Sequence, residues 1–239
     1  MRALIIRRSE TDLKPDIHEN TDLLICARWL VPAVPEGAVL EHHAVAIRDR
    51  KIQAVLPVGE AVNRFGDCPR IDLDQHILLP GLVNAHGHAP MSLFRGVADD
   101  VPLKSWLEEK IWPLESQFVS AEFVTHGAEL AVAEMLLGGT TCFADMYFFP
   151  DAVARVATDA RIRVQLASPV LDFPSVWATS ADDYIARATA LHDAFRHSDL
   201  VYTAFGPHAP YTVSDQPLTK IMTLSEELDI PIHRHVHEK

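Results

Sequence analysis

The chain has 239 residues, 48% of them hydrophobic, and a formal net charge of −12 at pH 7. This acidic balance argues against a nucleic-acid partner and against a membrane surface, because both attract basic proteins. No apolar run approaches the ~20 residues that span a bilayer, and three widely spaced cysteines indicate a reducing compartment, so we expect a cytoplasmic protein.

The first predicted domain is a small β structure that follows a polar N-terminal tail of residues 1–20. Short apolar runs occur at Leu23–Cys26, Ala44–Ile47 and Ile52–Leu56, and Pro, Gly or charged residues separate them. Runs of this length with turn residues between them predict antiparallel strands. We therefore assign residues 21–76 to a small, incomplete β-sheet or β-sandwich domain.

From Ile77 onward, predicted strands alternate with predicted helices. The strands are expected at Ile77–Ala85, Thr140–Tyr147, Ile162–Val170, Leu200–Phe205 and Ile230–His235. The helices are expected near Ala121–Leu137, Asp151–Asp159, Ala181–Phe195 and Pro217–Leu228. This alternation predicts an α/β fold with a parallel sheet, either doubly wound or closed into a (β/α)₈ barrel of the TIM type. No glycine-rich phosphate loop follows the first strand, which argues against the doubly wound nucleotide-binding fold.

Histidines lie at the ends of these predicted strands. Of the 13 histidines in the chain, three groups occupy such positions: His86 with His88, then His208, then His233 with His235 and His237. Barrel enzymes assemble their active sites where the strands end at the C-terminal face, so these positions favour the barrel. His86 and His88 are two residues apart on one strand and therefore point to the same face, where two imidazoles can bind one metal ion.

The predicted barrel is incomplete. Five strand–helix units fit between Ile77 and the end of the chain, whereas a barrel has eight. A complete barrel takes about 250 residues, and about 160 are available here. We therefore expect residues 77–239 to form about five of the eight units, and the chain to be the N-terminal part of a longer protein.

Six motifs follow one another along the chain: Pro80–His88, Met91–Gly96, Trp106-Leu107, Gly138–Tyr147, Gly206–Tyr211 and Ile232–Glu238. Their order and spacing resemble the amidohydrolase superfamily, in the branch that contains the 5-methylthioadenosine/S-adenosylhomocysteine deaminases and the chlorotriazine hydrolases. The resemblance extends from about Thr21 to the end of the chain. It implies that residues 77–239 form part of a metal-dependent amidohydrolase barrel.

The resemblance implies one Zn²⁺ per chain, held by His86, His88 and His235. The family's His-X-X-Glu pattern maps onto His235 and Glu238. Spacing alone does not distinguish His235 from the histidines two residues on either side, because alternation places all three on one face. Some relatives hold two metals through a carboxylated lysine, but no lysine lies in a predicted barrel strand, which favours a single metal.

The resemblance also implies roles for residues around the metal. A metal lowers the pKa of bound water towards ~7. Glu238 then resembles the catalytic proton shuttle, which protonates the ring nitrogen and helps ammonia to leave. His208 resembles the substrate-contacting histidine, and Trp106 resembles an aromatic wall beside the nucleoside, with a buried core tryptophan as the alternative. Asp145 is expected to be structural or to support a ligand. Family members often carry an acidic residue near this tryptophan for the ribose hydroxyls, but its neighbours here are Lys104, Ser105 and Glu108.

The implied activity of the full-length protein is hydrolytic deamination of 5′-methylthioadenosine or S-adenosylhomocysteine to the inosine analogue and ammonia. Such an enzyme is a hydrolase of C–N bonds, other than peptide bonds, in cyclic amidines. Two alternatives stay open: another aminohydrolase of the superfamily, of guanine, cytosine or triazine type, and an inactive truncated fragment.

The fragment alternative stands because the family's sixth-strand histidine and eighth-strand aspartate have no counterpart in this chain. We therefore expect the 239 residues alone to be inactive. The expected partner is a small-molecule nucleoside, with no nucleic acid and no membrane. The motifs leave the oligomeric state open, including a homo-oligomer.

Overall fold

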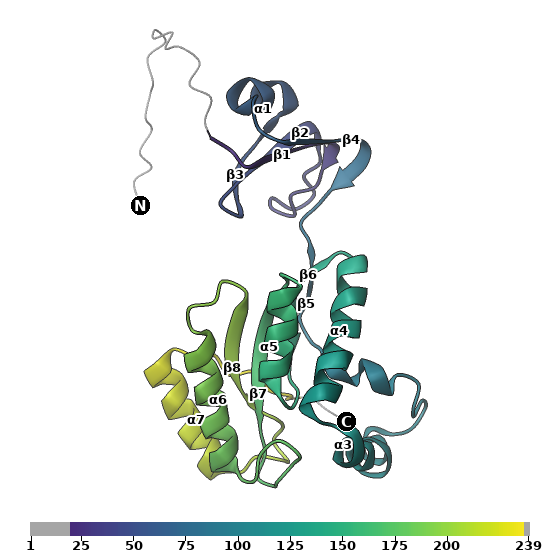
Figure 1. Ribbon diagram of the computed structural model, residues 1–239, viewed down its shortest axis with the longest axis vertical. Helices are drawn as coiled ribbons and strands as arrows, with labels where there is room; N and C mark the ends of the chain where they lie inside the picture. The colour runs from purple at the N-terminus through teal and green to yellow at the C-terminus, as the bar shows by residue number, and fades with distance from the viewer. Residues whose placement is uncertain (1–19, 237–239) are drawn as a thin grey trace. The chain divides into compact units, whose positions relative to one another are not determined.

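The structure is a computed structural model that describes residues 20–236 (Figure 1). Contacts divide the chain into two compact units, with the boundary between Pro80 and Gly81. Each unit contains a four-stranded sheet. Among the helices of residues 20–236, none combines the length and the apolarity that crossing a membrane requires.

The sheet of the first unit has the strand order β3-β2-β1-β4. Its elements are β1 (Leu23–Leu30), β2 (Leu40–Arg48), β3 (Lys51–Pro57), α1 (Val58–Phe65) and β4 (Arg70–Leu78). β2 pairs antiparallel with both β1 and β3, which confirms the three predicted strands, while β4 pairs parallel with β1. Helix α1 packs Ala61 and Phe65 onto Leu24 and Cys26, and this contact forms the core of the unit.

The sequence prediction missed α1 and β4. In β4 the apolar residues Ile71 and Leu73 alternate with charged ones, so the strand contains no continuous apolar run. In α1 the buried residues Ala61 and Phe65 are four apart, which is a helical spacing spread over only eight residues. In both elements the apolar residues are too few to identify a helix or a strand from the sequence, without the strands that α1 and β4 pack against.

The second unit has a parallel sheet in the order β5-β6-β7-β8, which confirms the α/β prediction. The strands are β5 (Leu82–Asn84), β6 (Thr140–Asp145), β7 (Arg163–Val170) and β8 (Val201–Pro207). The four predicted helices are present as α4 (Ala121–Leu137), α5 (Pro150–Asp159), α6 (Ala181–Phe195) and α7 (Asp215–Leu228). Shorter helical segments between β5 and α4 are η1 (Ala89–Phe94), α2 (Leu103–Ser105), η2 (Trp106–Ile111, a π-helix) and α3 (Trp112–Phe118).

Two predicted strands differ from the structure, both at prolines. The expected strand Ile77–Ala85 is interrupted at Pro80, so Ile77 belongs to β4 and only Leu82–Asn84 pairs with β6. The expected strand Ile230–His235 is reduced to an isolated parallel bridge between Phe205 and Ile232. Proline has no backbone N–H to donate, and Pro231 precedes this bridge as Pro80 precedes β5, so neither segment forms a continuous ladder.

The core of the second unit lies between the sheet and helices α4 to α7, which run along it (Figure 1). Phe143 and Val164 on the strands pack in one cluster with Val124 of α4 and Val153 of α5. A second cluster joins the end of β8 to α6 and α7. Because the strands are parallel, their carboxyl ends share one edge of the sheet, and the loops that follow them lie close together.

Candidate metal centre

The turn that follows β5 carries two of the predicted site residues. β5 ends at Asn84, whose side-chain oxygen accepts a hydrogen bond from the N–H of His86 at 3.3 Å. Gly87 separates His86 from His88, and a Cβ atom at Gly87 would lie 3.2 Å from the carbonyl oxygen of Ala144. The turn therefore lies directly against the end of β6.

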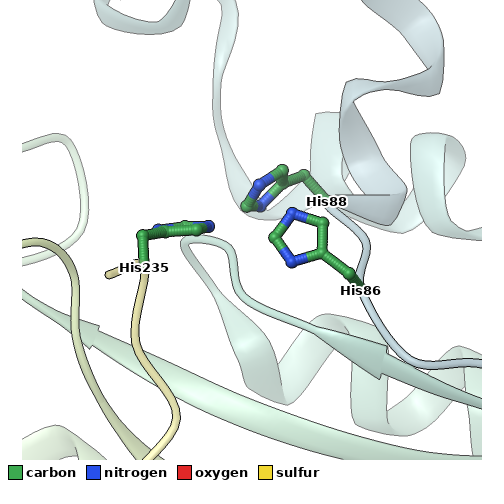
Figure 2. Close-up of side chains that lie close together, drawn as sticks. All are labelled: His86, His88 and His235. Atoms are coloured by element: carbon green, nitrogen blue, oxygen red, sulfur yellow. The ribbon is translucent and has the colours of Figure 1, made fainter. Parts of the chain in front are cut away.

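Three imidazoles meet at this edge of the sheet. The ring of His86 lies 5.2 Å from that of His88 and 5.2 Å from that of His235, and the rings of His88 and His235 are 5.3 Å apart. One nitrogen from each ring can be chosen so that all lie within 4.8 Å of one another. Figure 2 shows the rings converging from two segments, the turn after β5 and the segment that follows β8 and α7. Within residues 20–236, no other group of three His, Cys, Asp or Glu side chains lies close enough together to hold a metal ion.

Backbone carbonyl groups orient two of these rings. Nδ1 of His88 lies 2.7 Å from the carbonyl oxygen of Met146, and Nδ1 of His235 lies 3.2 Å from the carbonyl oxygen of His208. A carbonyl oxygen only accepts, so Nδ1 carries the proton and donates it, which assigns the lone pair of each neutral ring to Nε2. Metal-binding histidines are held in this way in proteins. The donor set and its orientation therefore fit a divalent metal with a preference for nitrogen, such as zinc.

His233 occupies a different position from His235. Its N–H donates to the carbonyl oxygen of Phe205 at 2.9 Å, and its ring lies 6.5 Å from that of His86. Burial lowers the pKa of His233, and the rings of His86 and His235 add to this effect. The structure thus brings His235 into the cluster rather than its neighbour. The third histidine of the motif, His237, and the predicted proton shuttle, Glu238, lie outside the described residues.

The end of β6 adds a buried carboxyl group beside the turn. Asp145 is 1% exposed and accepts a hydrogen bond from the N–H of Ala89. Burial raises the pKa of the Asp145 carboxyl to about 7, and the hydrogen bond from Ala89 opposes this shift.

A cavity of about 280 Å³ opens beside the cluster and brings in the other predicted residues. His88, His208, His235 and Trp106 all line it. The ring of His208 lies 5.0 Å from that of His235, and its Nδ1 is 3.0 Å from the hydroxyl of Thr212. Trp106 is half-buried on the cavity wall, so it is not a fully buried core residue. The rest of the lining is mostly apolar, with aromatic side chains at Trp112, Tyr147, Phe148 and Phe173.

The sequence prediction missed Glu115, the carboxylate that lines this cavity. The hydroxyl of Tyr147 donates to its Oε1 at 2.8 Å, and burial raises the pKa of Glu115 while this hydrogen bond lowers it. Burial also raises the pKa of Tyr147, and Glu115 adds to that effect. The sequence carries no signal for this, because a glutamate beside apolar residues is common on helices and its burial depends on Tyr147, 32 residues away.

Comparison with known proteins agrees with this arrangement. The sequence pattern of the amidohydrolase family matches residues 77–239. A Saccharophagus degradans protein named 5-methylthioadenosine/S-adenosylhomocysteine deaminase is 51% identical over 217 residues, which are 91% of this chain and 49% of that protein. The chain thus spans about half the length of the curated relatives it matches.

Two solved structures that contain zinc are similar to this chain in fold. The crystal structure of an adenosine deaminase from Xanthomonas campestris with bound zinc is 48% identical, with a TM-score of 0.86 over 90% of this chain and 49% of that one. An atrazine chlorohydrolase from Arthrobacter aurescens, complexed with zinc, shares the fold at 23% identity and a TM-score of 0.81, over 90% of this chain and 53% of that one.

Proposed function

The chain belongs to the amidohydrolase family, and we propose that the protein carrying it hydrolytically deaminates 5′-methylthioadenosine and S-adenosylhomocysteine. The observation that supports this most directly is the cluster of His86, His88 and His235 beside an aromatic cavity. The name of the 51% identical relative supports the choice of substrate.

The proposed architecture is a partial (β/α)₈ barrel in residues 77–239, preceded by a small β-sandwich domain in residues 21–76. The parallel sheet with its alternating helices and the likeness to an adenosine deaminase at a TM-score of 0.86 support it. The compact unit that ends at Pro80 supports the division, with Ile77 and Leu78 on the side of the β domain because they belong to β4.

The proposed cofactor is one Zn²⁺ held by His86, His88 and His235. The Nδ1 hydrogen bonds of His88 and His235 support this, as does the bound zinc of the structural relative. When bound, zinc lowers the pKa of a coordinated water towards neutrality and so supplies the nucleophile.

The chain's own residues then have three tasks. Trp106 stacks on the purine and His208 contacts it, which holds the carbon bearing the amine at the metal side of the cavity. Glu238 accepts a proton from the attacking water and gives it to the ring nitrogen, then accepts the proton of the new hydroxyl group and gives it to the departing amine. The C–N bond breaks, oxygen from water takes the place of nitrogen, and the products are the inosine analogue and ammonia.

The partner that this reaction requires is a small nucleoside. A cytoplasmic location remains our prediction from cysteine usage, and within the described residues Cys26, Cys68 and Cys142 are free thiols.

The test is a substrate panel assayed on the whole protein that carries this sequence, loaded with zinc. We expect ammonia release and an inosine-type product from 5′-methylthioadenosine and S-adenosylhomocysteine, and much slower reaction with guanine, cytosine and an amino-triazine. A higher kcat/KM for one of the latter three would assign the protein to another branch of the family. No turnover of any of them would overturn the proposal.

A further inference from the structure

Asp145 is a buried acidic residue that the proposed reaction does not use. It is the last residue of β6, and β6 pairs in parallel with β5, whose Asn84 lies opposite Phe143. The turn that leaves β5 therefore passes directly over the end of β6. With 1% of its surface exposed, Asp145 is buried beneath that turn.

Asp145 and its neighbour Met146 hold the turn at three points around His88. The carboxylate of Asp145 accepts the N–H of Ala89, the residue after His88. The N–H of Met146 donates to the carbonyl oxygen of Gly87, the residue before it, at 3.2 Å. The carbonyl oxygen of Met146 accepts Nδ1–H of the His88 ring itself, at 2.7 Å. A shift of the turn along β6 would break all three hydrogen bonds.

The opposite side of the same segment is packed as closely. A Cβ atom at Gly127 of α4 would lie 2.3 Å from the carbonyl oxygen of Pro90 and 2.7 Å from its Cα. The backbone from Gly87 to Pro90 is thus confined between β6 and α4. The N–H of Ala89 is buried in this space, and the Asp145 carboxylate is what satisfies it.

We propose that Asp145 is a positioning residue for the metal centre. By accepting the N–H of Ala89 it sets where His88 lies relative to His86 and His235, and so the geometry in which the three rings bind a metal. This inference rests on the proposed metal site. It assigns to Asp145 no contact with metal or substrate.

The two carboxylate oxygens of Asp145 differ in their contacts, which makes the hydrogen bond to Ala89 testable by substitution. Oδ2 of Asp145 is buried and has no hydrogen-bond partner among the described residues, so only Oδ1 has a task in this arrangement. Asp145→Asn keeps an oxygen that accepts the N–H of Ala89, whereas Asp145→Ala removes it. Asp145→Leu keeps the branched shape of the side chain but, like Asp145→Ala, offers no oxygen to the N–H of Ala89.

The experiment measures metal affinity on the whole protein, stripped of metal and titrated with Zn²⁺ or Co²⁺ against a chelator. We expect about 10- to 100-fold weaker binding for Asp145→Ala, as for other residues that orient metal ligands. Asp145→Asn should recover most of the loss. Asp145→Leu should lose affinity as Asp145→Ala does, because both remove the same hydrogen bond. The visible spectrum of bound Co²⁺ should change in Asp145→Ala and Asp145→Leu and stay as in wild type in Asp145→Asn.

Ser168→Ala is the matched control. Ser168 is also 1% exposed, lies on the adjacent strand β7, and its Oγ has no hydrogen-bond partner among the described residues. Its affinity for metal should equal that of wild type. Equal losses in Ser168→Ala and Asp145→Ala, or wild-type affinity in both Asp145→Ala and Asp145→Leu, would overturn the proposal. If Asp145→Ala does not fold, Asp145→Leu decides. If wild type itself binds no metal, the proposed metal centre fails rather than the role of Asp145.

Discussion

The cavity has two walls that are held in different ways. The strand wall consists of His88, Met146, His208 and His235, which follow the ends of strands or the segment beside β8. The helical wall consists of Trp106, Trp112 and Glu115, which lie on η2 and α3. Backbone hydrogen bonds join the members of the strand wall, among them His235 N–H to the His208 carbonyl oxygen at 3.0 Å. The helical wall is held by side chains, as in the 2.8 Å hydrogen bond from Tyr147 to Glu115.

The difference indicates a division of labour. Metal ligands require a fixed geometry, and positions held by backbone hydrogen bonds on a sheet edge supply it. Side chains on a short irregular helical segment adapt more easily, and Trp112 is still 37% exposed. Metal binding is therefore expected on the strand wall, which also carries the substrate contact His208, and the rest of substrate selection on the helical wall. Variants in one wall should therefore leave the properties of the other wall unchanged.

The largest effect is expected when the strand wall loses its metal ligands. The double variant His86→Ala/His88→Ala should lose the ~1 equivalent of zinc per chain expected of a single site, and turnover should fall to background. Metal analysis and an ammonia assay check this. The control is His126→Ala on α4, because His126 is exposed and lies beside Glu122 and Glu129 of its own helix. An unchanged metal content in the double variant would rule out the site.

Removal of the proton shuttle should be nearly as damaging without affecting the metal. Glu238→Gln keeps the shape of the side chain but cannot transfer a proton, so kcat should fall by about 10²- to 10⁴-fold. Metal content and KM should stay near the wild-type values. Steady-state kinetics together with metal analysis separate this outcome from a loss of binding. Near-wild-type kcat would place the shuttle on another residue.

A pH effect on stability should follow from the buried carboxyl group under the strand wall. Burial raises the pKa of Asp145 from 3.8 to about 7, so the folded state holds its proton more tightly than the unfolded state does. The contribution of this group to the free energy of unfolding is therefore fully present below pH 3.8. It falls as the pH rises from 3.8 to about 7, and it is lost above about pH 7. A pKa shift of this size corresponds to a change in the free energy of unfolding on the order of 4 kcal/mol.

Asparagine does not titrate, so Asp145→Asn removes this pH dependence. In metal-free protein, the free energy of unfolding of Asp145→Asn relative to wild type should rise between about pH 4 and about pH 8 by an amount of that order. Urea unfolding of both proteins at several pH values measures the difference. A difference that stays constant with pH would show that Asp145 ionises as easily in the folded protein as in the unfolded one.

The smallest effect is expected on the helical wall. Stacking of a base on an aromatic side chain contributes about 1–3 kcal/mol, so Trp106→Ala should raise KM by about 5- to 150-fold. Trp106→Phe should retain part of the stacking and have a smaller effect. Zinc content should not change in either variant. A loss of zinc in Trp106→Ala would show that the two walls depend on each other.

The sequence predicted those parts of the fold and of the site that depend on residues close together in the chain. Helices α4 and α6 were predicted at their observed bounds, and in the structure Ser120 and Ser180 cap their first turns, which is a local feature. His86 and His88 were candidates because alternation along a strand would point both side chains the same way, whereas in the structure they lie in the turn after β5. The interrupted strand at Pro80 was predicted too long, because the apolar residues on both sides of Pro80-Gly81 read as one run although they belong to different sheets.

What the tertiary structure alone decided are the contacts between distant segments. Spacing left His233 and His235 equivalent, and only the position of the β5 turn shows which ring lies beside His88. Glu115 and Tyr147 are 32 residues apart, and Asp145 and Ala89 are 56 apart. Such hydrogen bonds have no local pattern, because their free energy depends on which strand ends the sheet brings together. The sequence by itself determined the chemical groups of this site and the segments that carry them, while the packing of the parallel sheet determined which of those groups meet.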